Sequence, residues 1–343
     1  MKEKIEQIVL SAIKEKIFPA CVIGIIKKDG EKIILPFGRF TYGENSPLVK
    51  EDSIFDVASI TKSIPTASLA LKLINEERLN IDDKLIKFIP EFQNNQREKV
   101  LIKHLLTYTV NFGFKLSEHK DKSADEILKL ILTAEFREKP GKTFVYGNAT
   151  SILLGMAIER IYKDKLDNIS QEIFFNPLKM KRTSFKPLEN FSKNEIVPTE
   201  IDDWRGKIIQ GEAHDESAYK LREKMIVGSA GLFSTVPDLL NFMESLLNES
   251  KEIIELMTTN QLGYLNESFG LGWALNQPSF MGKYRDGKTF GKTGFTGCSC
   301  VGDINRGVAL VILSNYTYPK RKPQNPSFIN IIRSKLADVV FGQ

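Results

Sequence analysis

The stretches Cys21-Val-Ile-Gly-Ile-Ile26, near the start of the chain, and Val308-Ala-Leu-Val-Ile-Leu313, near its end, decide the fold. Both are short apolar runs rich in β-branched residues, a pattern typical of buried β-strands. Asp29-Gly30 and a second apolar run over residues 32–37 follow the first stretch, and together they predict a β-hairpin. Strands at both ends of the chain predict one antiparallel sheet to which both ends contribute.

Helical patterns flank and separate these strands. The spacing of Ile5, Val9, Ile13 and Ile17 predicts an amphipathic first helix, and residues 328–341 predict an amphipathic last one. Residues 59–73 and 149–162 also read as helices, residues 163–225 are irregular, and β patterns return over residues 269–275 and 294–301.

This arrangement predicts an α/β (α+β) fold, an antiparallel sheet flanked by terminal helices with an inserted helical region. We expect residues 1–75 and 225–343 to form the sheet domain and residues 76–224 a mainly helical inserted domain. The active site is expected in the cleft between them, because pockets favour such junctions.

The composition is that of an ordinary globular protein, with 42% hydrophobic and 27% charged residues over 343 positions. The net charge is only +5 and no basic block is present, so nucleic-acid binding is not expected. No apolar run approaches the ~18 residues of a membrane span. The N-terminal residues lack the pattern of a secretory signal, and three cysteines fit a reducing compartment, so we expect a cytoplasmic protein.

Two patterns carry little weight when taken alone. Residues 282–289 fit the phosphate-loop pattern G-x-x-x-x-G-K-[ST], but a β pattern follows where a phosphate loop needs a helix, so we interpret the segment as a hairpin turn. Ser-x-x-Lys begins at Ser59 and also at Ser11, Ser117 and Ser217, as expected in a lysine-rich chain.

Context separates Ser59-Ile-Thr-Lys62 from the other three occurrences. It follows a buried apolar stretch and begins a helix, where backbone N–H groups favour developing negative charge. A hydroxyl and an amine one helical turn apart supply a nucleophile and a base, since a desolvated lysine can take the proton of a serine. Tyr146-Gly-Asn148 and Lys292-Thr293-Gly294 follow later in the chain, and the ordered set is far more specific than any member.

In this order the motifs resemble those of the serine β-lactamase and penicillin-binding-protein superfamily, and within it the class C β-lactamase-like esterases and peptidases. Residues 55–62, 140–148 and 290–297 look like the nucleophile segment and the second and third motifs. The resemblance covers nearly the whole chain and implies a β-lactamase/transpeptidase-like fold. Further blocks that are similar to family segments are residues 176–183, 214–218, 230–235 and 270–273.

The resemblance implies a role for the residues of the first two motifs. Ser59 is implied to be the nucleophile that accepts the acyl group, and Lys62 and Tyr146 to share the proton transfers. Asn148 is implied to bind the substrate beside the scissile bond. No metal ion and no cofactor is implied.

The third motif is implied to bind the substrate. Lys292 would supply electrostatic support and Thr293 a hydrogen bond to a substrate carboxylate, while Gly294 has no side chain to block a ligand. The backbone N–H of Phe295, with that of the nucleophile, is implied to form the oxyanion hole. Lys292 brought close to Lys62 would repel it, which lowers the pKa of an amine and helps to supply a neutral base.

Several positions differ from the family pattern or have a second interpretation. Residues 105–113, Leu-Leu-Thr-Tyr-Thr-Val-Asn-Phe-Gly, differ from the Leu-Leu-Thr-His-Thr-Ser-Gly that relatives usually carry, so the resemblance leaves the pocket wall and the substrate preference open. Cys298 follows the third motif and is interpreted as a small buried residue. His214 is a candidate for lining the pocket, whereas His104 and His119 are interpreted as structural or solvent-facing.

We therefore expect a serine hydrolase that forms an acyl-enzyme on Ser59 and acts on a small ester or amide. A β-lactamase or D-Ala-D-Ala carboxypeptidase is the alternative, with a β-lactam or peptide as its small-molecule partner. A third interpretation is a non-catalytic ligand-binding relative, which a serine-reactive probe would not label.

Overall fold

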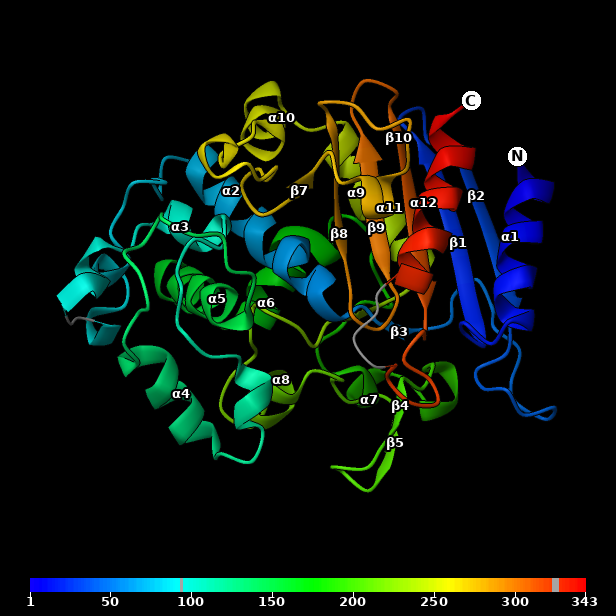
Figure 1. Cartoon of the computed structure of the whole chain (residues 1–343), viewed down its shortest axis with the longest axis horizontal. Helices are drawn as coiled ribbons and strands as arrows, with labels where there is room; N and C mark the ends of the chain where they lie inside the picture. Colours follow the sequence, from blue (N-terminus) through cyan, green and yellow to red (C-terminus); the bar gives the residue numbers. More distant parts are fainter. Residues whose placement is uncertain (93–94, 323–326) are drawn as a thin grey trace.

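A six-stranded antiparallel sheet forms one side of the molecule in the computed structural model, which describes residues 1–92, 95–322 and 327–343 (Figure 1). The order of its strands is β2-β1-β10-β9-β8-β7. They are β1 (Ala20–Lys27), β2 (Lys32–Gly38), β7 (Ala274–Leu275), β8 (Thr289–Thr293), β9 (Ser299–Asp303) and β10 (Val308–Ser314).

The two stretches that predict the sheet pair with each other at its centre. β1 pairs with β10 in a register that runs from Cys21 opposite Ser314 to Lys27 opposite Val308. β1 also pairs with β2 as the predicted hairpin. The prediction that both ends of the chain build one antiparallel sheet is confirmed.

The strands β1 and β10 are continuous apolar runs because both faces of the sheet are covered. Successive side chains point to opposite faces, so Ile23 and Ile312 contribute to one apolar core while Val22 and Val311 contribute to the other. α1 (Lys2–Lys14), α11 (Pro278–Met281) and α12 (Ser327–Phe341) pack on the first face, and α9 (Val236–Leu247) packs on the second. The predicted terminal helices are confirmed (Figure 1).

The helical region lies beside the sheet, toward β8 (Figure 1). All of its α-helices except α7 pack into the same apolar core as α9. The domain boundaries at residues 75 and 225 stay a prediction. The helices are α2 (Ser68–Asn75), α3 (Ile102–Leu106), α4 (Ala124–Thr133), α5 (Asn148–Tyr162), α6 (Leu166–Ser170), α7 (Pro187–Asn190), α8 (Glu216–Leu221) and α10 (Lys251–Thr258).

Short elements complete the chain. Two small antiparallel pairs join β3 (Phe55–Asp56) to β6 (Phe233–Ser234) and β4 (Glu200–Asp202) to β5 (Lys207–Ile209). The remaining turns are 3-10 or π helices: η1 (Ala58–Lys62), η2 (Ser63–Ala67), η3 (Leu85–Lys87), η4 (Pro90–Phe92), η5 (Asn95–Lys99), η6 (Leu116–His119), η7 (Gln171–Phe175), η8 (Lys193–Glu195) and η9 (Gly263–Leu265).

The single helix predicted over residues 59–73 is wrong in its first half. A 3-10 turn, η1, carries Ser59, and a π turn, η2, precedes α2. Ile64 has extended dihedral angles, φ −114° and ψ 106°. Pro65 follows it, and the proline ring disfavours a helical conformation of the residue before it. The helix therefore becomes regular only after the proline.

The predicted β segment over residues 294–301 is also wrong in its first part. β8 ends at Thr293 and β9 begins at Ser299, so residues 294–298 form the turn between two paired strands. Most of residues 269–275 lies outside any strand, with only Ala274–Leu275 paired to β8. Residues 282–289 lead into β8 and not into a helix, which agrees with our rejection of a phosphate loop.

The closeness of β1 to α9 predicts the effect of a small substitution. A Cβ at Gly24 would lie 2.3 Å from Val236 Cγ1, and valine in a helix has little rotamer freedom with which to move aside. Gly24→Ala should therefore lower the free energy of unfolding by about 1–3 kcal/mol. Gly287→Ala is the control, because a Cβ there meets nothing within 4 Å. Equal urea midpoints for the two variants would contradict this packing.

Candidate active site

Ser59 lies on a tight turn that directly follows the short strand β3. Ala58, the residue before it, adopts a positive φ of 47°, a conformation that is uncommon for a residue with a side chain. The buried carboxylate of Asp56 holds the turn, since it accepts hydrogen bonds from Ala58 N at 2.8 Å and His214 N at 2.7 Å. The 3-10 turn then brings Lys62 back under Ser59.

Lys62 is buried, with 1% of its surface exposed. Its Nζ donates to Ser59 Oγ at 3.0 Å and to Ser229 O at 2.7 Å. Burial disfavours the charged form and lowers the pKa of Lys62 to about 8, against the opposing effect of the Asp215 carboxylate. The structure therefore places the Lys62 amine within hydrogen-bond distance of the Ser59 hydroxyl.

Tyr146 approaches Ser59 from the opposite side, on the loop before α5. This loop is held by the hydrogen bond from Val145 N to Tyr108 O, at 2.8 Å. The Tyr146 ring is partly exposed, with its centroid 5.3 Å from Lys62 Nζ. Burial of the phenol raises the pKa of Tyr146, and a hydrogen bond with the Ser59 hydroxyl acts in the opposite sense.

Asn148 is the first residue of α5, and its side-chain amide is tied to the segment before α8. Nδ2 donates to Asp215 Oδ2 at 2.7 Å and to Ser217 Oγ at 3.1 Å. The sequence singled out neither partner as functional, and it set Ser217 aside as part of a chance Ser-x-x-Lys. Their only signal is their place in the family-like block of residues 214–218.

Lys292 extends from β8 into a cage of aromatic rings. Its Nζ lies 4.4 Å from the centroid of Tyr146, 4.8 Å from that of Tyr108 and 5.6 Å from that of Phe269. It also lies 3.4 Å from Tyr108 Oη. Burial, and next to it the charge of Lys62, holds the pKa of Lys292 well below its usual range. Tyr108, the departure from the family pattern, is thus part of the wall around this amine.

The turn after β8 brings the third motif against the nucleophile segment. A Cβ at Gly294 would lie 2.3 Å from Val57 O, so only glycine allows this approach. Thr293 is half-buried at the end of β8, and the Phe295 ring is 57% exposed beyond it. Within the described residues, the backbone N–H groups of Ser59 and Phe295 make no hydrogen bond to a backbone acceptor in another element.

Arg333 of α12 supports this turn from beneath. Its buried guanidinium donates from Nη2 to Gly294 O at 2.9 Å and to Cys298 O at 2.7 Å. Burial lowers the pKa of Arg333 to about 10. Cys298 is fully buried next to the turn, and all three cysteines are free, as the sequence indicated.

His214 does not stand alone beside the nucleophile segment. Its Nε2 lies 2.9 Å from Glu200 Oε2, and Glu200 also accepts from Arg321 Nε at 2.8 Å. Arg321 Nη1 reaches Glu216 Oε1 at 2.7 Å. The centroid of the His214 ring lies 5.5 Å from that of the exposed Phe295 ring, so the network of Glu200, Arg321 and Glu216 borders the site.

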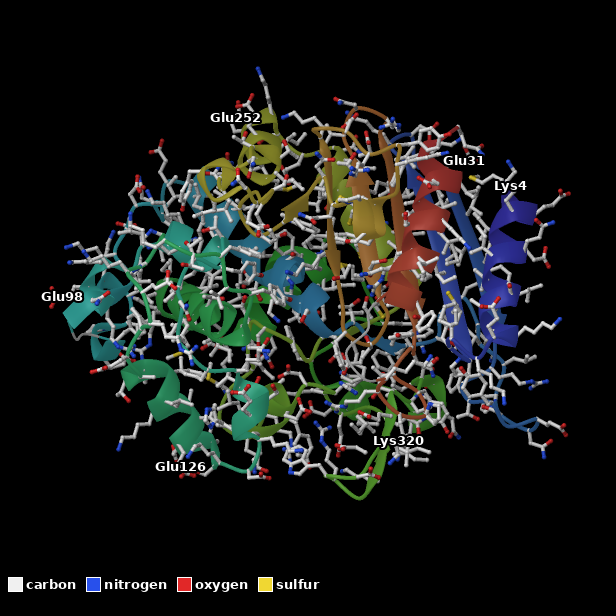
Figure 2. The ribbon with its side chains drawn as sticks, in the orientation of Figure 1. Lys4, Glu31, Glu98, Glu126, Glu252 and Lys320 are labelled. Atoms are coloured by element: carbon white, nitrogen blue, oxygen red, sulfur yellow. The ribbon has the colours of Figure 1, made fainter. Side chains whose placement is uncertain are left out.

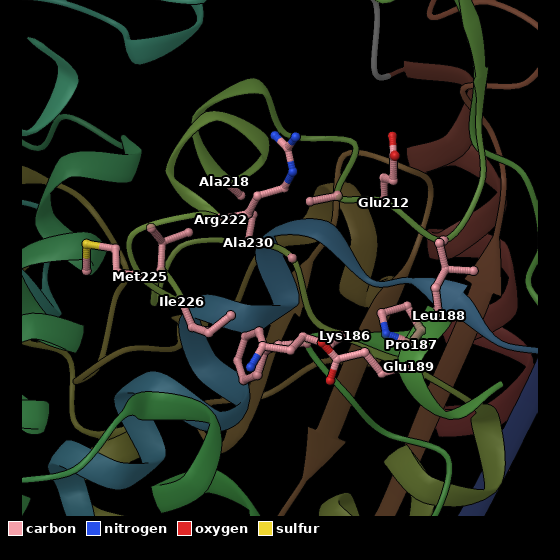
Figure 3. Close-up of a pocket in the computed structure, with 15 residues that line it drawn as sticks. Lys186, Pro187, Leu188, Glu189, Glu212, Ala218, Arg222, Met225, Ile226 and Ala230 are labelled. Carbon is pink, nitrogen blue, oxygen red and sulfur yellow. The ribbon is translucent and has the colours of Figure 1, made fainter. Parts of the chain in front are cut away.

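The structure brings the residues predicted from the three motifs together at the junction of the sheet and the helical region. A separate cavity of about 290 Å³ lies on the far side of α8 (Figure 3). Ala218 and Ala230 line it, whereas Ser59 and Lys62 do not. Charged side chains of both signs project around the molecule in Figure 2, among them Lys4, Glu31, Glu98, Glu126, Glu252 and Lys320.

The part of the chain that the structure describes contains neither a cluster of metal ligands nor a membrane-spanning helix. No three His, Cys, Asp or Glu side chains among residues 1–92, 95–322 and 327–343 are grouped as metal ligands would be. In the same part of the chain, no helix has the length and apolar character needed to cross a membrane.

Comparison with known proteins identifies the family. The sequence profile of the Beta-lactamase family matches residues 15–332, and the chain belongs to this family of serine hydrolases. A putative D-alanyl-D-alanine carboxypeptidase of Escherichia coli K12 is 28% identical over 317 residues, which span 80% of this chain and 72% of the relative. An N-acetylmuramyl-L-alanine amidase of Bacillus subtilis is 24% identical over 358 residues, 90% of this chain and 80% of the relative.

Solved structures show the same fold. The LovD6 mutant of simvastatin synthase from Aspergillus terreus superposes with a TM-score of 0.78 at 19% identity, over 99% of this chain and 94% of that one. An octameric penicillin-binding protein homologue from Pyrococcus abyssi superposes with a TM-score of 0.76 at 24% identity, over 99% of this chain and 77% of that one. EstCE1, a hydrolase with promiscuous acyltransferase activity, superposes with a TM-score of 0.74 at 19% identity, over 98% of both chains. The β-lactamase/transpeptidase-like fold is confirmed.

The approach of Gly294 to Val57 predicts a loss of activity without unfolding. In Gly294→Ala the new Cβ must push the turn away from the nucleophile segment, because its neighbour is backbone. A displacement of about 1 Å in an active site can cost on the order of 10²-fold in kcat. We expect a loss of this order in a Gly294→Ala protein that still folds, together with a melting temperature below that of Gly287→Ala, because the new Cβ strains the backbone around it. Full activity in Gly294→Ala would show that the position of the turn does not matter.

Proposed function

We propose that this chain forms an acyl-enzyme on Ser59 and hydrolyses small ester or amide substrates. The observation that carries the proposal is the 3.0 Å contact between Ser59 Oγ and the buried Nζ of Lys62. A serine hydroxyl is a weak nucleophile until a neighbouring base takes its proton.

The lowered pKa of Lys62 supports its role as this base. An amine with a pKa of about 8 is roughly 10% neutral at pH 7, about 300-fold more than a lysine at its ordinary value of 10.5. Burial of Lys62 supplies this neutral fraction, while the Asp215 carboxylate opposes it by raising the pKa of Lys62.

Acylation then has a balanced course. Ser59 Oγ attacks the carbonyl carbon and its proton moves to Lys62 Nζ, while the N–H groups of Ser59 and Phe295 bind the oxyanion. The bond from the carbonyl carbon to the leaving oxygen or nitrogen breaks. The leaving group takes a proton from Lys62 through the phenol of Tyr146, which contacts Ser59.

Deacylation uses water as the second nucleophile. A water molecule gives its proton to the same Lys62–Tyr146 pair and adds to the acyl carbon, and the bond to Ser59 Oγ breaks as this oxygen takes the proton back from the pair. The products are a carboxylic acid and the free hydroxyl of Ser59. The proposed cycle balances without a metal ion or a cofactor.

The alternative is a β-lactamase or a D-Ala-D-Ala carboxypeptidase, and similarity to the putative D-alanyl-D-alanine carboxypeptidase of Escherichia coli supports the second of these. Both would need a group that binds a substrate carboxylate, for which we propose Lys292 and Thr293. Esters remain the first proposal because an alcohol departs after acylation and leaves room for water. The amine released from a β-lactam stays tethered and can shield the acyl carbon.

Replacing the nucleophile tests the covalent route. Intact-mass analysis should show one acyl group on the wild-type chain after incubation with a serine-reactive phosphonate, a penicillin or an activated ester. Ser59→Ala should add no mass and should lose turnover by at least several orders of magnitude.

Ser11→Ala is the matched control, because Ser11 belongs to an exposed Ser-x-x-Lys and its hydroxyl donates to the Glu15 carboxylate, away from Ser59. Ser217 cannot serve, since it contacts Asn148. Labelling of Ser59→Ala at the wild-type rate would refute the mechanism, and an unlabelled wild type would favour a non-catalytic ligand-binding protein.

Substrate preference separates the two enzymatic alternatives. We expect a higher kcat/KM for short-chain nitrophenyl esters than for nitrocefin, measured by steady-state kinetics on one preparation. The physical reason is the tethered amine, which slows deacylation after a β-lactam opens. A higher kcat/KM for nitrocefin would overturn the ester proposal in favour of a β-lactamase.

A further inference from the structure

Asp215 touches two parts of the proposed active site through one carboxylate. Its Oδ2 accepts from Asn148 Nδ2 at 2.7 Å, and its Oδ1 accepts from Ser217 Oγ at 2.5 Å and from Ala218 N at 2.9 Å. Burial acts to raise the pKa of Asp215, but the charge of Lys62 and these hydrogen bonds outweigh it and lower the pKa. The group is therefore an ionised, fixed acceptor.

An ionised acceptor at this place settles which way the Asn148 amide faces. A carboxylate can only accept hydrogen bonds, so the atom 2.7 Å from Asp215 must be the NH2 nitrogen and not the carbonyl oxygen. The second proton of that nitrogen is directed to Ser217 Oγ, at 3.1 Å. Both donors of Asn148 are thus used within the protein.

The remaining atom of the amide is Oδ1. Among the described residues no group donates to it, which leaves it available to a ligand. An acceptor at this position fits a substrate N–H and has nothing to offer a substrate carbonyl. The expected acyl group therefore carries an N–H beside the carbonyl that Ser59 attacks.

We propose that Asp215 is a positioning residue that fixes Asn148 with Oδ1 toward the substrate, selects acyl groups bearing an N–H donor, and sets a negative charge beside Lys62. The proposal rests on the acyl-enzyme function proposed for Ser59. It narrows the substrate class from small esters and amides in general to esters and amides whose acyl group is an N-acylated amino acid or a similar group with an N–H.

The charge of Asp215 gives the proposal a second, independent readout. The groups that face Lys62 are Asp215, the Tyr146 phenol and Lys292 of β8, and Asp56 faces Asp215 in turn. Of these, Asp215 raises the pKa of Lys62. Removing its charge lowers that pKa, so the neutral base forms at lower pH and the acidic limb of the pH–rate profile moves down.

Asp215→Asn is the decisive variant, because asparagine keeps the size of the side chain and also caps helices well. The acidic limb of kcat/KM should move down by about one pH unit. Asp203→Asn removes an exposed carboxylate outside the site and should leave the limb where it is.

Two matched substrates test the N–H donor. The nitrophenyl esters of N-acetylglycine and of acetoxyacetic acid have the same shape, but an oxygen replaces the N–H in the second. After correction for spontaneous hydrolysis, the wild type should prefer the first by about tenfold in kcat/KM, as one hydrogen bond allows. In Asp215→Asn the amide of Asn148 is free to turn over, and the preference should fall severalfold.

Ser217→Ala separates the two roles, because it removes one acceptor of Asn148 and keeps the charge. The preference of Ser217→Ala for the N–H substrate should fall, while the acidic limb of its pH profile of kcat/KM stays in place. If Asp215→Asn does not fold, Ser217→Ala still tests whether the orientation of Asn148 sets the N–H preference. If the wild type is labelled on Ser59 but shows no N–H preference, or if the limb of a folded Asp215→Asn does not move, the role of Asp215 is wrong. An unlabelled wild type would instead refute the proposed function itself.

Discussion

The burial of Lys62 under Ser59 is the constraint on which the rest of the site depends. A buried amine is costly unless it is paired or neutral, and Lys62 has one backbone carbonyl, one hydroxyl and one nearby carboxylate. These neighbours come from segments far apart in the chain. The β3–β6 pair, the turn before α8 and the end of β8 are each placed where they can surround this amine.

The aromatic wall adds a second constraint on charge. Lys292 lies among three rings, whose faces attract a cation, while burial and the neighbouring Lys62 oppose its charging. Two neighbouring buried amines, of which only Lys62 is influenced by a carboxylate, cannot easily both be protonated. Burial lowers the pKa of both amines, and the positions of the neighbouring charges adjust it further. Among those neighbours, the Asp215 carboxylate favours the protonated form of Lys62.

The features that the sequence predicted correctly are those set by residues close together in the chain. The hairpin of β1 and β2, α5 and the terminal helices follow from periodicity, and the order of the three motifs indicated Ser59 and Lys62. The sequence missed what depends on long-range contact: Asp215 meets Asn148 across 67 positions, and Tyr108 meets Lys292 across 184. The irregular turn at Ile64 was missed because helical spacing outweighed the proline after it.

The contact of Arg333 with the turn after β8 bears on how this protein is made. β1 is synthesised well before its partner β10 and before the helix that carries Arg333. Until β10 and this helix are made, one edge of β1 has no partner, and the turn that carries Phe295 lacks the hydrogen bonds of Arg333. The central sheet therefore cannot close during the synthesis of the intervening residues, and an apolar strand edge stays exposed for that time.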